Sequence, residues 1–211
     1  QWQRGAVGNA RWSGPRLKDV LALARPRPEA RHLELEGHDR PVMEATPKFI
    51  RGIPLGKGVH PDTIIALRMN DVALPPAHGF PARLVVPGWV ADDWMKWLSR
   101  IAVLAEEPKG FFYQTAYRFP TTPGAPGAPV AADQMQTMQQ LVVKSLIATP
   151  ADQSVLAPGK VTVRGVAFAG EQRIATVEVS IDGGVRWTGA RLEAIAAEGS
   201  TIRDYRAGDG R

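Results

Sequence analysis

The sequence predicts two domains, a mixed α+β domain followed by an all-β domain. Three features of its 211 residues support this prediction. One helical pattern and several short apolar runs share the first part of the chain, and a segment rich in proline and glycine follows Tyr117. Beyond that segment the patterns are strand-like and separated by glycine-rich turns. We therefore predict a first domain over 1–117, a linker over 118–138 and a second domain over 139–211.

The first domain is expected to begin with a helix over Ser13–Ala24. Ser13 is a good N-cap, Pro15 suits the first turn, and apolar residues recur on one face. Pro26 should end this helix, because proline lacks a backbone N–H and clashes with the preceding turn. A second, short helix is expected over 91–99, and strands are expected at 32–36, 64–67, 84–86 and 100–103.

The second domain is expected to be an immunoglobulin-like sandwich. Strands are predicted at 141–147, 161–168 and 175–181, and Asp182–Gly184 predicts a hairpin turn. The linker before it is too rich in proline and glycine to predict regular structure. Because a full sandwich of this kind needs about 100 residues, we expect the second domain to be incomplete. The sequence opens at Gln1 without an initiator methionine and reaches Arg211 without a closing element, so we expect the chain to be an internal piece of a longer protein and the first domain to be incomplete as well.

Charge and composition narrow the function classes. The formal charge of +5 comes from 26 basic and 21 acidic residues, and the basic residues are scattered. This pattern argues against nucleic acid as a partner and is compatible with a small anion or an acidic protein. No apolar run approaches the roughly 18 residues of a membrane span, and no targeting segment is visible.

The residues exclude several kinds of metal site. The chain has no cysteine, so disulfides, cysteine-based zinc sites, iron–sulfur clusters and covalently bound c-type haem are excluded within it. A histidine-rich metal site is not expected either, because the four histidines lack ligand spacing; they are His32, His38, His60 and His78.

The segment His78–Trp97 carries the strongest indication of a binding site. Its sequence is HGFPARLVVPGWVADDWMKW, in which His78, Arg83 and Lys96 surround one short strand and turn. Arginine binds phosphate in a bidentate manner and lysine supplies a point charge, so together they predict a site for a planar anion. Taken singly, His78 suits a structural hydrogen bond, Arg83 a surface strand edge, and Lys96 a solvated position with its stem on an indole.

Three further residues have both a structural and a functional interpretation. Asp39 follows a predicted strand and is either a turn residue or an acceptor for a ligand amino group. Tyr117 is either a packing anchor or a phenol that hydrogen-bonds an oxyanion or transfers a proton. Trp2 lies too close to Gln1 for its own context to favour one role.

Several segments, in one order and spacing, are similar to the sulfite oxidase family of molybdenum enzymes, particularly its bacterial sulfite dehydrogenases. The block His78–Trp97 is the most specific of them. The others are Gly5–Gly14 with Arg16–Leu21, Leu35–Asp39, Ile53–Leu55, Ala66–Asp71, Gln114–Arg118, Val143–Ile147 and Val177–Trp187.

The resemblance implies a molybdopterin-binding domain followed by an immunoglobulin-like dimerisation domain, with molybdenum-molybdopterin as the cofactor. Tyr117 matches an active-site tyrosine, and Trp2 matches a tryptophan that lines the substrate pocket. The family's cysteine ligand to molybdenum is expected upstream of Gln1, and a further substrate arginine beyond Arg211. The positions that match those holding the pterin and its phosphate are Asp39, His78, Arg83, Trp94, Met95 and Lys96.

The activity implied is oxidation of sulfite to sulfate, with electrons passed to a cytochrome c or a haem subunit. A homodimer and a periplasmic location are implied by the same resemblance. Two alternatives remain open at this point. One is a sulfoxide reductase or sulfane dehydrogenase on the same scaffold, and the other is a metal-free binding or assembly protein that uses the sandwich domain.

Overall fold

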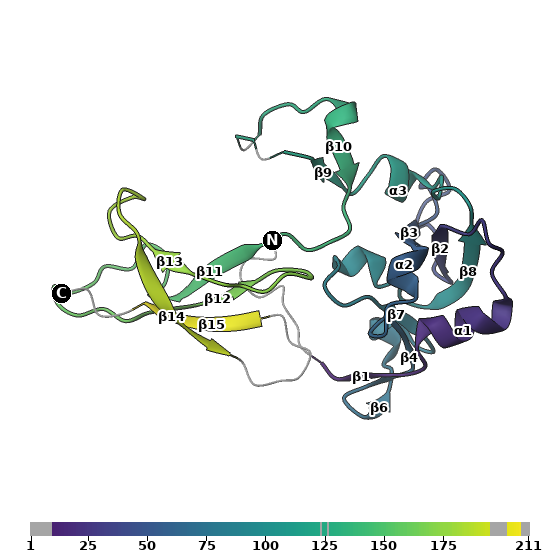
Figure 1. Ribbon diagram of the computed structural model, residues 1–211, viewed down its shortest axis with the longest axis horizontal. Coiled ribbons are helices and arrows are strands. Elements are labelled where there is room, and N and C mark those ends of the chain that lie inside the picture. Colours follow the sequence, from purple (N-terminus) through teal and green to yellow (C-terminus); the bar gives the residue numbers. More distant parts are fainter. Residues whose placement is uncertain (1–9, 123, 126, 195–201, 208–211) are drawn as a thin grey trace. The chain divides into compact units, whose positions relative to one another are not determined.

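The computed structural model describes residues 10–122, 124–125, 127–194 and 202–207, and for 194 and 202–207 it describes the backbone alone. The chain divides into two compact units, Gln1–Gln139 and Gln140–Arg211 (Figure 1). The first unit combines short helices with small sheets, and the second consists of strands and loops. None of the described helices is long and apolar enough to cross a membrane.

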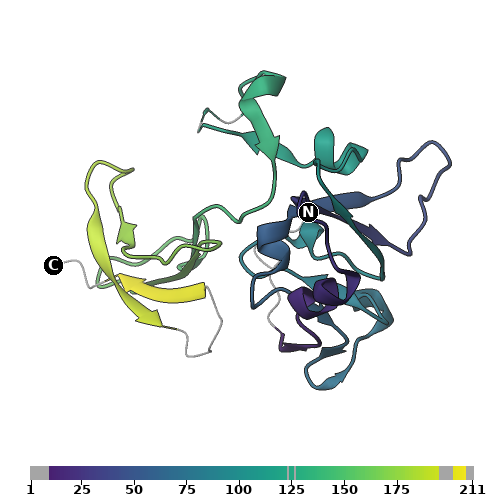
Figure 2. The ribbon, with the colours of Figure 1, turned by 45° about the vertical axis from the view of Figure 1, so that its right-hand side comes forward.

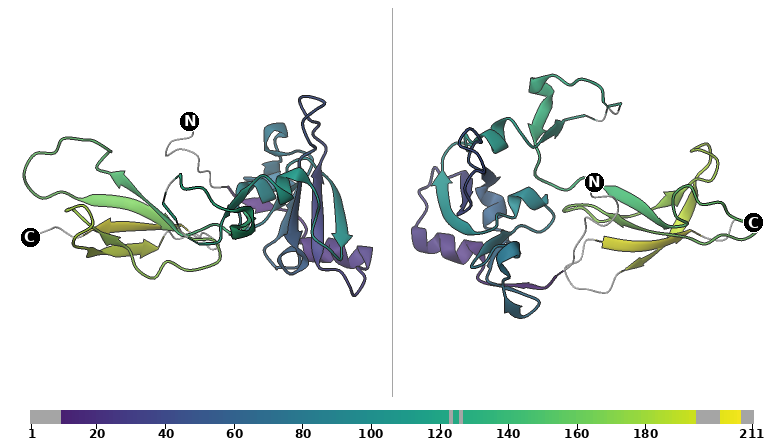
Figure 3. Two further views of the ribbon diagram at one scale, coloured as in Figure 1. Left: turned by 90° about the horizontal axis from the view of Figure 1, so that it is seen from above. Right: turned by 180° about the vertical axis from the view of Figure 1, so that it is seen from behind.

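The largest sheet of the first unit has β2 (His32–Gly37) at its centre, between β3 (Ile50–Pro54) and β8 (Leu98–Leu104). Both pairings are antiparallel. In β2, Leu33 and Leu35 are fully buried and alternate with partly exposed polar residues. The alternation shows that one face of this sheet packs against the core while the other is solvated. Figure 3 shows the sheet and α1 from two further sides.

Three smaller antiparallel sheets complete the strands of this unit. One joins β4 (Ile64–Ala66) to β7 (Arg83–Val85), and another joins β9 (Arg118–Pro120) to β10 (Met135–Thr137). The third contains β1 (Trp12–Ser13), β5 (Arg68–Met69) and β6 (Val72–Ala73). The strands predicted at 32–36, 64–67, 84–86 and 100–103 are thus confirmed, with small differences at their ends.

The first predicted helix is present but begins later than expected. Helix α1 spans Leu17–Ala24, and its N-cap residue Arg16 makes no side-chain capping bond. Ser13 lies in β1 instead, because the backbone from Trp12 to Arg16 is extended and pairs with other strands. The other helices are α2 (Leu55–Gly58), α3 (Phe111–Gln114) and the 3₁₀ turns η1 (Pro76–His78), η2 (Ala91–Asp93) and η3 (Ala132–Gln134).

The helix predicted over 91–99 is wrong beyond Asp93. Only η2 is helical, and β8 already begins at Leu98. The reason is tertiary, because the backbone carbonyl of Met95 accepts a hydrogen bond of 2.8 Å from the N–H of Leu84 and the segment runs beside β7. A neighbouring strand therefore takes up backbone groups that a helix would have paired internally.

The segment predicted as an unstructured linker contains a strand pair. β9 and β10 pair near its two ends, and the N–H of Thr121 continues the pairing to the carbonyl of Gln134 (Figure 2). The whole of 118–138 lies within the first compact unit. Proline is tolerated in β9 because it stands at the end of an edge strand, where it interrupts few ladder bonds.

The core of the first unit is formed by apolar side chains from α1, the large sheet and the segment around β7. These residues come from distant parts of the sequence, so their burial joins the elements into one unit. They are Leu17, Leu21, Leu33, Leu35, Ile53, Leu84, Val86, Trp89 and Met95.

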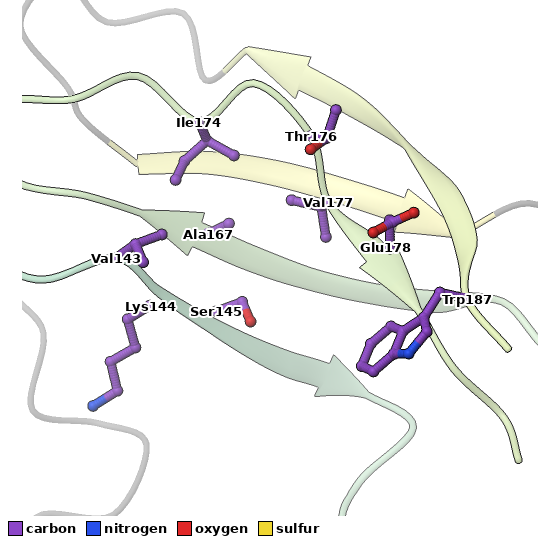
Figure 4. A pocket seen from close by; sticks show the side chains of 9 residues that line it. All are labelled: Val143, Lys144, Ser145, Ala167, Ile174, Thr176, Val177, Glu178 and Trp187. Atoms are coloured by element: carbon purple, nitrogen blue, oxygen red, sulfur yellow. The ribbon is translucent and has the colours of Figure 1, made fainter. Parts of the chain in front are cut away.

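The second unit is all-β, as predicted. Its described strands form one antiparallel sheet in the order β11-β12-β15-β14-β13. Residues of both edges, around β11 and β13, line a common pocket of about 400 Å³, so the sheet curls until its edges face each other (Figure 4). The strands are β11 (Lys144–Thr149), β12 (Val163–Phe168), β13 (Glu178–Val179), β14 (Thr188–Ala194) and β15 (Ile202–Ala207).

The hairpin turn predicted at Asp182–Gly184 is confirmed between β13 and β14. Gly183 and Gly184 have φ values of 72° and 91°, which glycine adopts at little cost. Oδ1 of Asp182 accepts hydrogen bonds from the backbone N–H groups of Val185 and Arg186 at 3.1 and 2.9 Å. The bond from Arg186, together with those from the Ser180 hydroxyl and Val185, lowers the pKa of the Asp182 carboxyl below its usual value.

Candidate cofactor-binding and active site

The candidate site begins with the sharp turn that follows η1. Gly79 has a φ of 109°, and a Cβ at this position would lie 3.0 Å from Cα of Lys96 and 3.1 Å from Cβ of Arg83. Both the backbone conformation and the space therefore require glycine. The close approach brings His78, Arg83 and Lys96 together, although they are separated in the sequence.

Arg83 is a buried cation, not the surface charge at a strand edge that was its structural alternative. Its side chain is 9% exposed, and its guanidinium donates to the carbonyls of His78 and Trp94 at 3.1 Å each. It also lies 4.8 Å from the ring centroid of Trp12. Nε of Arg83 is buried and has no hydrogen-bond partner among the described residues.

Burial lowers the pKa of Arg83 from its ordinary value. Because an arginine remains protonated in proteins, the site keeps a desolvated positive charge with one donor unused. Trp94 is similar in one respect, since its buried Nε1 also has no described partner. The two residues are adjacent, with the Arg83 guanidinium 5.9 Å from the Trp94 ring centroid. A buried donor without a partner is unfavourable, so these two mark a place where a ligand would improve the bonding.

Lys96 lies at the more exposed side of the same turn. Its Nζ donates to the carbonyl of Ala77 at 3.3 Å and lies 4.2 Å from the ring centroid of Trp97. Nε1 of Trp97 in turn donates to the carbonyl of Pro76 at 2.9 Å. The ammonium group is therefore held over an aromatic face next to η1, as a point charge beside the buried guanidinium.

Asp39 and Met95 both approach Gly37 at the end of β2. A Cβ on Gly37 would lie 2.3 Å from Oδ1 of Asp39 and 3.4 Å from Sδ of Met95, so the absence of a side chain there lets both approach. Met95 belongs to the buried core, while Asp39 is exposed. Asp39 borders a pocket of about 540 Å³, whose other lining residues are His38, Phe80, Pro81, Trp97, Leu98 and Ser99.

The structure therefore gathers six of the sequence-predicted residues around the turn at Gly79 and the end of β2. We call this group the cradle. Its members are Asp39, His78, Arg83, Trp94, Met95 and Lys96.

Tyr117 lies among a different set of side chains. Its ring is 6.1 Å from the rings of Phe49 and Phe112, and the residue is 43% exposed. Its backbone has a φ of 49°, an unusual value for a residue with a side chain. The carbonyl of Tyr117 accepts a hydrogen bond of 2.7 Å from the N–H of Met138, which holds this conformation.

Beneath Tyr117 lies a buried cation that the sequence analysis did not single out. Arg51, in β3, is fully buried, and its guanidinium is 5.4 Å from the ring centroid of Tyr117. Its Nε donates to Oδ1 of Asp93 at 2.9 Å, and its Nη2 is 3.0 Å from Oδ2 of Asp92. The signal in the sequence was an arginine inside an otherwise apolar strand, together with two adjacent carboxylates before Trp94.

The two carboxylates share one guanidinium in a buried place. This leaves an excess negative charge, and Oδ2 of Asp93 has no described hydrogen-bond partner. Burial outweighs the attraction of Arg51 and, helped by repulsion from Asp92, raises the pKa of Asp93 to about 7. Burial also raises the pKa of Asp92. The pair therefore takes up a proton at a higher pH than ordinary aspartates do.

The remaining predicted site residue is a tryptophan near the start of the chain. Trp2 lies outside the described residues. Trp12, which was quoted only as part of a matching segment, covers the Arg83 guanidinium and packs edge-on against Trp94 at 6.2 Å. Within the described ranges, no group of three or more histidine or acidic residues is arranged to hold a metal ion.

The family profile described as "Oxidoreductase molybdopterin binding domain" matches residues 1–112, more than half of the chain. The chain belongs to this family. A second profile, "Mo-co oxidoreductase dimerisation domain", matches residues 135–206, so the molybdopterin-binding oxidoreductase has the two-domain order expected from its sequence.

Curated sulfite oxidases are similar over most of the chain. The mitochondrial sulfite oxidase of Mus musculus is 36% identical over 198 residues, which cover 92% of this chain and 36% of the mouse protein. The sulfite oxidase of Arabidopsis thaliana is 36% identical over 200 residues, covering 90% of this chain and 50% of the plant protein. The chain thus spans between about a third and a half of these relatives.

A solved structure is similar in fold. The sulfane dehydrogenase SoxCD from Paracoccus pantotrophus superimposes with a TM-score of 0.74 and 31% identity, covering 94% of this chain and 47% of that chain. Together with the two profiles, this similarity confirms the predicted architecture of an α+β molybdopterin-binding domain followed by an immunoglobulin-like β domain.

The residues around the turn at Gly79 fit the family's molybdenum-molybdopterin cofactor in its organic part. They supply a buried guanidinium with a free Nε, a second cation at Lys96 and a pocket bordered by an acceptor at Asp39. These features suit a pterin that carries an anionic group. Protein thiolate ligation of the metal is not provided within these 211 residues, which contain no cysteine.

Proposed function

We propose that the protein is a molybdenum-dependent enzyme that oxidises sulfite to sulfate. The observation that carries the proposal is the cradle, in which a desolvated arginine with an unused donor lies beside a lysine and a pocket bordered by the Asp39 carboxylate. The similarity to sulfite oxidases from Mus musculus and Arabidopsis thaliana supports sulfite as the substrate.

The cradle residues would hold the cofactor and orient it. Arg83 and Lys96 would bind its anionic group, with His78 beside them, while Asp39 would accept hydrogen bonds from amino groups of the pterin. Trp94 would donate through Nε1, and Met95 would fix the backbone of this segment by packing in the core. When bound, the cofactor supplies the oxygen-transfer and redox chemistry.

Tyr117 would act on the substrate side. Its phenolic Oη would donate a hydrogen bond to the bound oxyanion, or hold a proton there, and the partly exposed ring leaves the hydroxyl accessible. Trp2 is proposed to line the substrate pocket on the basis of the sequence resemblance alone.

The partners follow from the same proposal. We propose a c-type cytochrome or haem subunit as the electron acceptor, a homodimer formed through the second unit, and a periplasmic location. The dimerisation-domain match to residues 135–206 supports the homodimer. The acceptor and the location rest on the resemblance to bacterial sulfite dehydrogenases.

The direct test is sulfite-dependent reduction of ferricyanide by the product of the native gene, expressed in a host that synthesises molybdopterin. Turnover that depends on both sulfite and molybdenum would support the proposal. A metal-loaded protein that does not turn over sulfite would contradict it. Protein from the same host grown with tungstate is the matched control.

A second candidate function is oxidation of a sulfane sulfur. It is favoured by the structural similarity to the sulfane dehydrogenase SoxCD, with a TM-score of 0.74. Assaying the same metal-loaded preparation with sulfite and with a protein-bound persulfide, separately, decides between the two substrates.

A further inference from the structure

We propose that Arg51 is a positioning residue, which holds the phenol of Tyr117 in place relative to the cofactor-binding segment. The inference rests on the proposed function for the role of Tyr117, but the placement itself is a property of the described side chains. Four observations carry it: the strand register, the bonds of the guanidinium, its connection to the cradle, and the backbone of Tyr117.

The register of the sheet places Arg51 on the buried face. Arg51 lies opposite Leu35 in β2, and Leu35 lies opposite Ile101 in β8. Residues directly opposite in an antiparallel pair share one face, and Leu35 is fully buried. An arginine in this row is unfavourable unless its donors are satisfied, so its presence calls for specific partners.

The guanidinium is bound from several segments at once. Besides Asp92 and Asp93, its Nη2 donates to the carbonyl of Met138 at 2.7 Å, and its Nη1 donates to the carbonyl of Phe112. The planar group is thus fixed in orientation by acceptors from η2, from α3 and from the residue after β10. Such a multiply bonded guanidinium is a rigid support for whatever packs on it.

Arg51 connects Tyr117 to the cradle through its carboxylate partners. Asp92 and Asp93 belong to η2 and are followed directly by the cradle residues Trp94, Met95 and Lys96. On the other side, Met138 accepts from Arg51 and donates its N–H to the carbonyl of Tyr117. One side chain therefore links the cofactor-binding segment with the backbone and the ring of the tyrosine.

Tyr117 needs such support because its backbone is in the left-handed region. A φ of 49° at a residue with a large side chain is maintained only where surrounding contacts hold it. The neighbouring rings of Phe49 and Phe112 restrict the tyrosine from its sides. The Arg51 guanidinium lies 5.4 Å from its centroid and adds a cation–π contact.

The test compares Arg51→Met, which removes the charge, with Arg51→Lys, which retains it. The matched control is Arg100→Met, because Arg100 lies on the same sheet between Glu34 and Glu36 but is exposed. The proteins are made in full length with 3-fluorotyrosine in place of tyrosine. The signal of Tyr117 is assigned by its absence from Tyr117→Phe.

In Arg51→Met we expect the fluorine resonance of Tyr117 to shift and broaden. We also expect kcat for sulfite to fall about tenfold or more, with KM and molybdenum content little changed, since a misplaced group lowers the rate of the chemical step. Arg51→Lys should recover part of both effects, and Arg100→Met should show neither. This combination distinguishes positioning from a general loss of structure.

An unshifted Tyr117 resonance in folded Arg51→Met would overturn the inference. If Arg51→Met does not fold, Asp92→Asn is used instead, because it weakens the ion pair between Arg51 and the less buried of its two carboxylate partners. An unshifted Tyr117 resonance in that variant would also overturn the inference. A shifted resonance in a protein that does not oxidise sulfite would support the positioning by Arg51 and contradict sulfite as the substrate. The two proposals therefore fail in different ways.

Discussion

The two units of the chain bury very different sets of side chains. In the first, a core of large apolar residues surrounds fully buried charged groups, including Arg51 and Asp93. In the second, the buried hydrophobic residues among those described are Ala167 and Ala169, whereas Ile181 is 91% and Trp187 59% exposed. A fixed arrangement of charges needs a packed surrounding, and among the side chains that the structure describes only those of the first unit provide one.

The residues to which we assign the proposed chemistry all lie in the better-packed unit. The cradle and Tyr117 both lie in the first unit, on backbone that is held by long-range hydrogen bonds and close contacts. The second unit exposes apolar side chains mainly in the loops between its strands, among them Val155, Ile181 and Val185, and exposed apolar surface is typical of an interaction site. Four predictions test or refine this contrast, in order of decreasing expected effect.

A pair of tryptophan substitutions tests the contrast directly. Trp89 is 9% exposed and packs in the core of the first unit, whereas Trp187 is 59% exposed in the second. Trp89→Ala should lower the free energy of unfolding by about 3–5 kcal/mol, the range for a buried aromatic. Trp187→Ala should lower it by less than about 1 kcal/mol. Urea titration with hydrogen exchange resolved by segment measures both; equal losses would contradict the contrast.

Substitution of the phenol refines the comparison within the first unit. Tyr117→Phe should lower kcat for sulfite roughly 100-fold, the lower end for loss of a proton-donating group, and leave molybdenum content unchanged. Tyr113→Phe is the control, since burial and nearby carboxylates raise the pKa of Tyr113 to about 12 and keep its hydroxyl neutral. Loss of bound metal in Tyr117→Phe would show that its role is in binding the cofactor.

Removal of Arg83, the buried cation of the cradle, should lower the amount of cofactor bound. The turnover of each protein molecule that still holds cofactor should change less. Arg83→Met is expected to lower cofactor content about tenfold or more, because a charge-assisted hydrogen bond to a ligand contributes roughly 1.5–3 kcal/mol. Molybdenum and pterin are measured on purified protein, with Arg100→Met for comparison. Full cofactor content in Arg83→Met would contradict the assigned role.

The carboxylate pair predicts a pH dependence of stability in the first unit. The pKa of Asp93 rises from 3.8 to about 7 because of burial, so between these values the folded chain holds a proton that the unfolded chain has lost. Stability should therefore fall as pH rises through this window, by up to about 1.4 kcal/mol per pH unit. Urea midpoints at pH 5, 6 and 7 measure the slope. Asp93→Asn should reduce the slope of stability against pH. An unchanged slope in this variant would show that other groups cause the pH dependence.

Local sequence patterns predicted the strands well and the helix ends poorly. The alternation around Leu33 and Leu35 identified β2, because period-two patterning comes directly from the geometry of a strand. The cap at Ser13 and the helix over 91–99 failed because strand pairing took up the backbone groups that helices would have used. Isolated motifs do not reveal such competition.

The sequence by itself determined the two-domain order, the hairpin at Asp182–Gly184 and the residues of the cradle. These depend on composition, on turn chemistry and on side chains that are close in the chain or belong to a recognisable block. Tertiary structure alone decided that Trp12 covers Arg83 and that Arg51 lies between Tyr117 and the carboxylates of η2. Contacts of this kind depend on strand register and on which buried charges meet. A local pattern contains neither, because both are set by the packing of segments that are distant in the sequence.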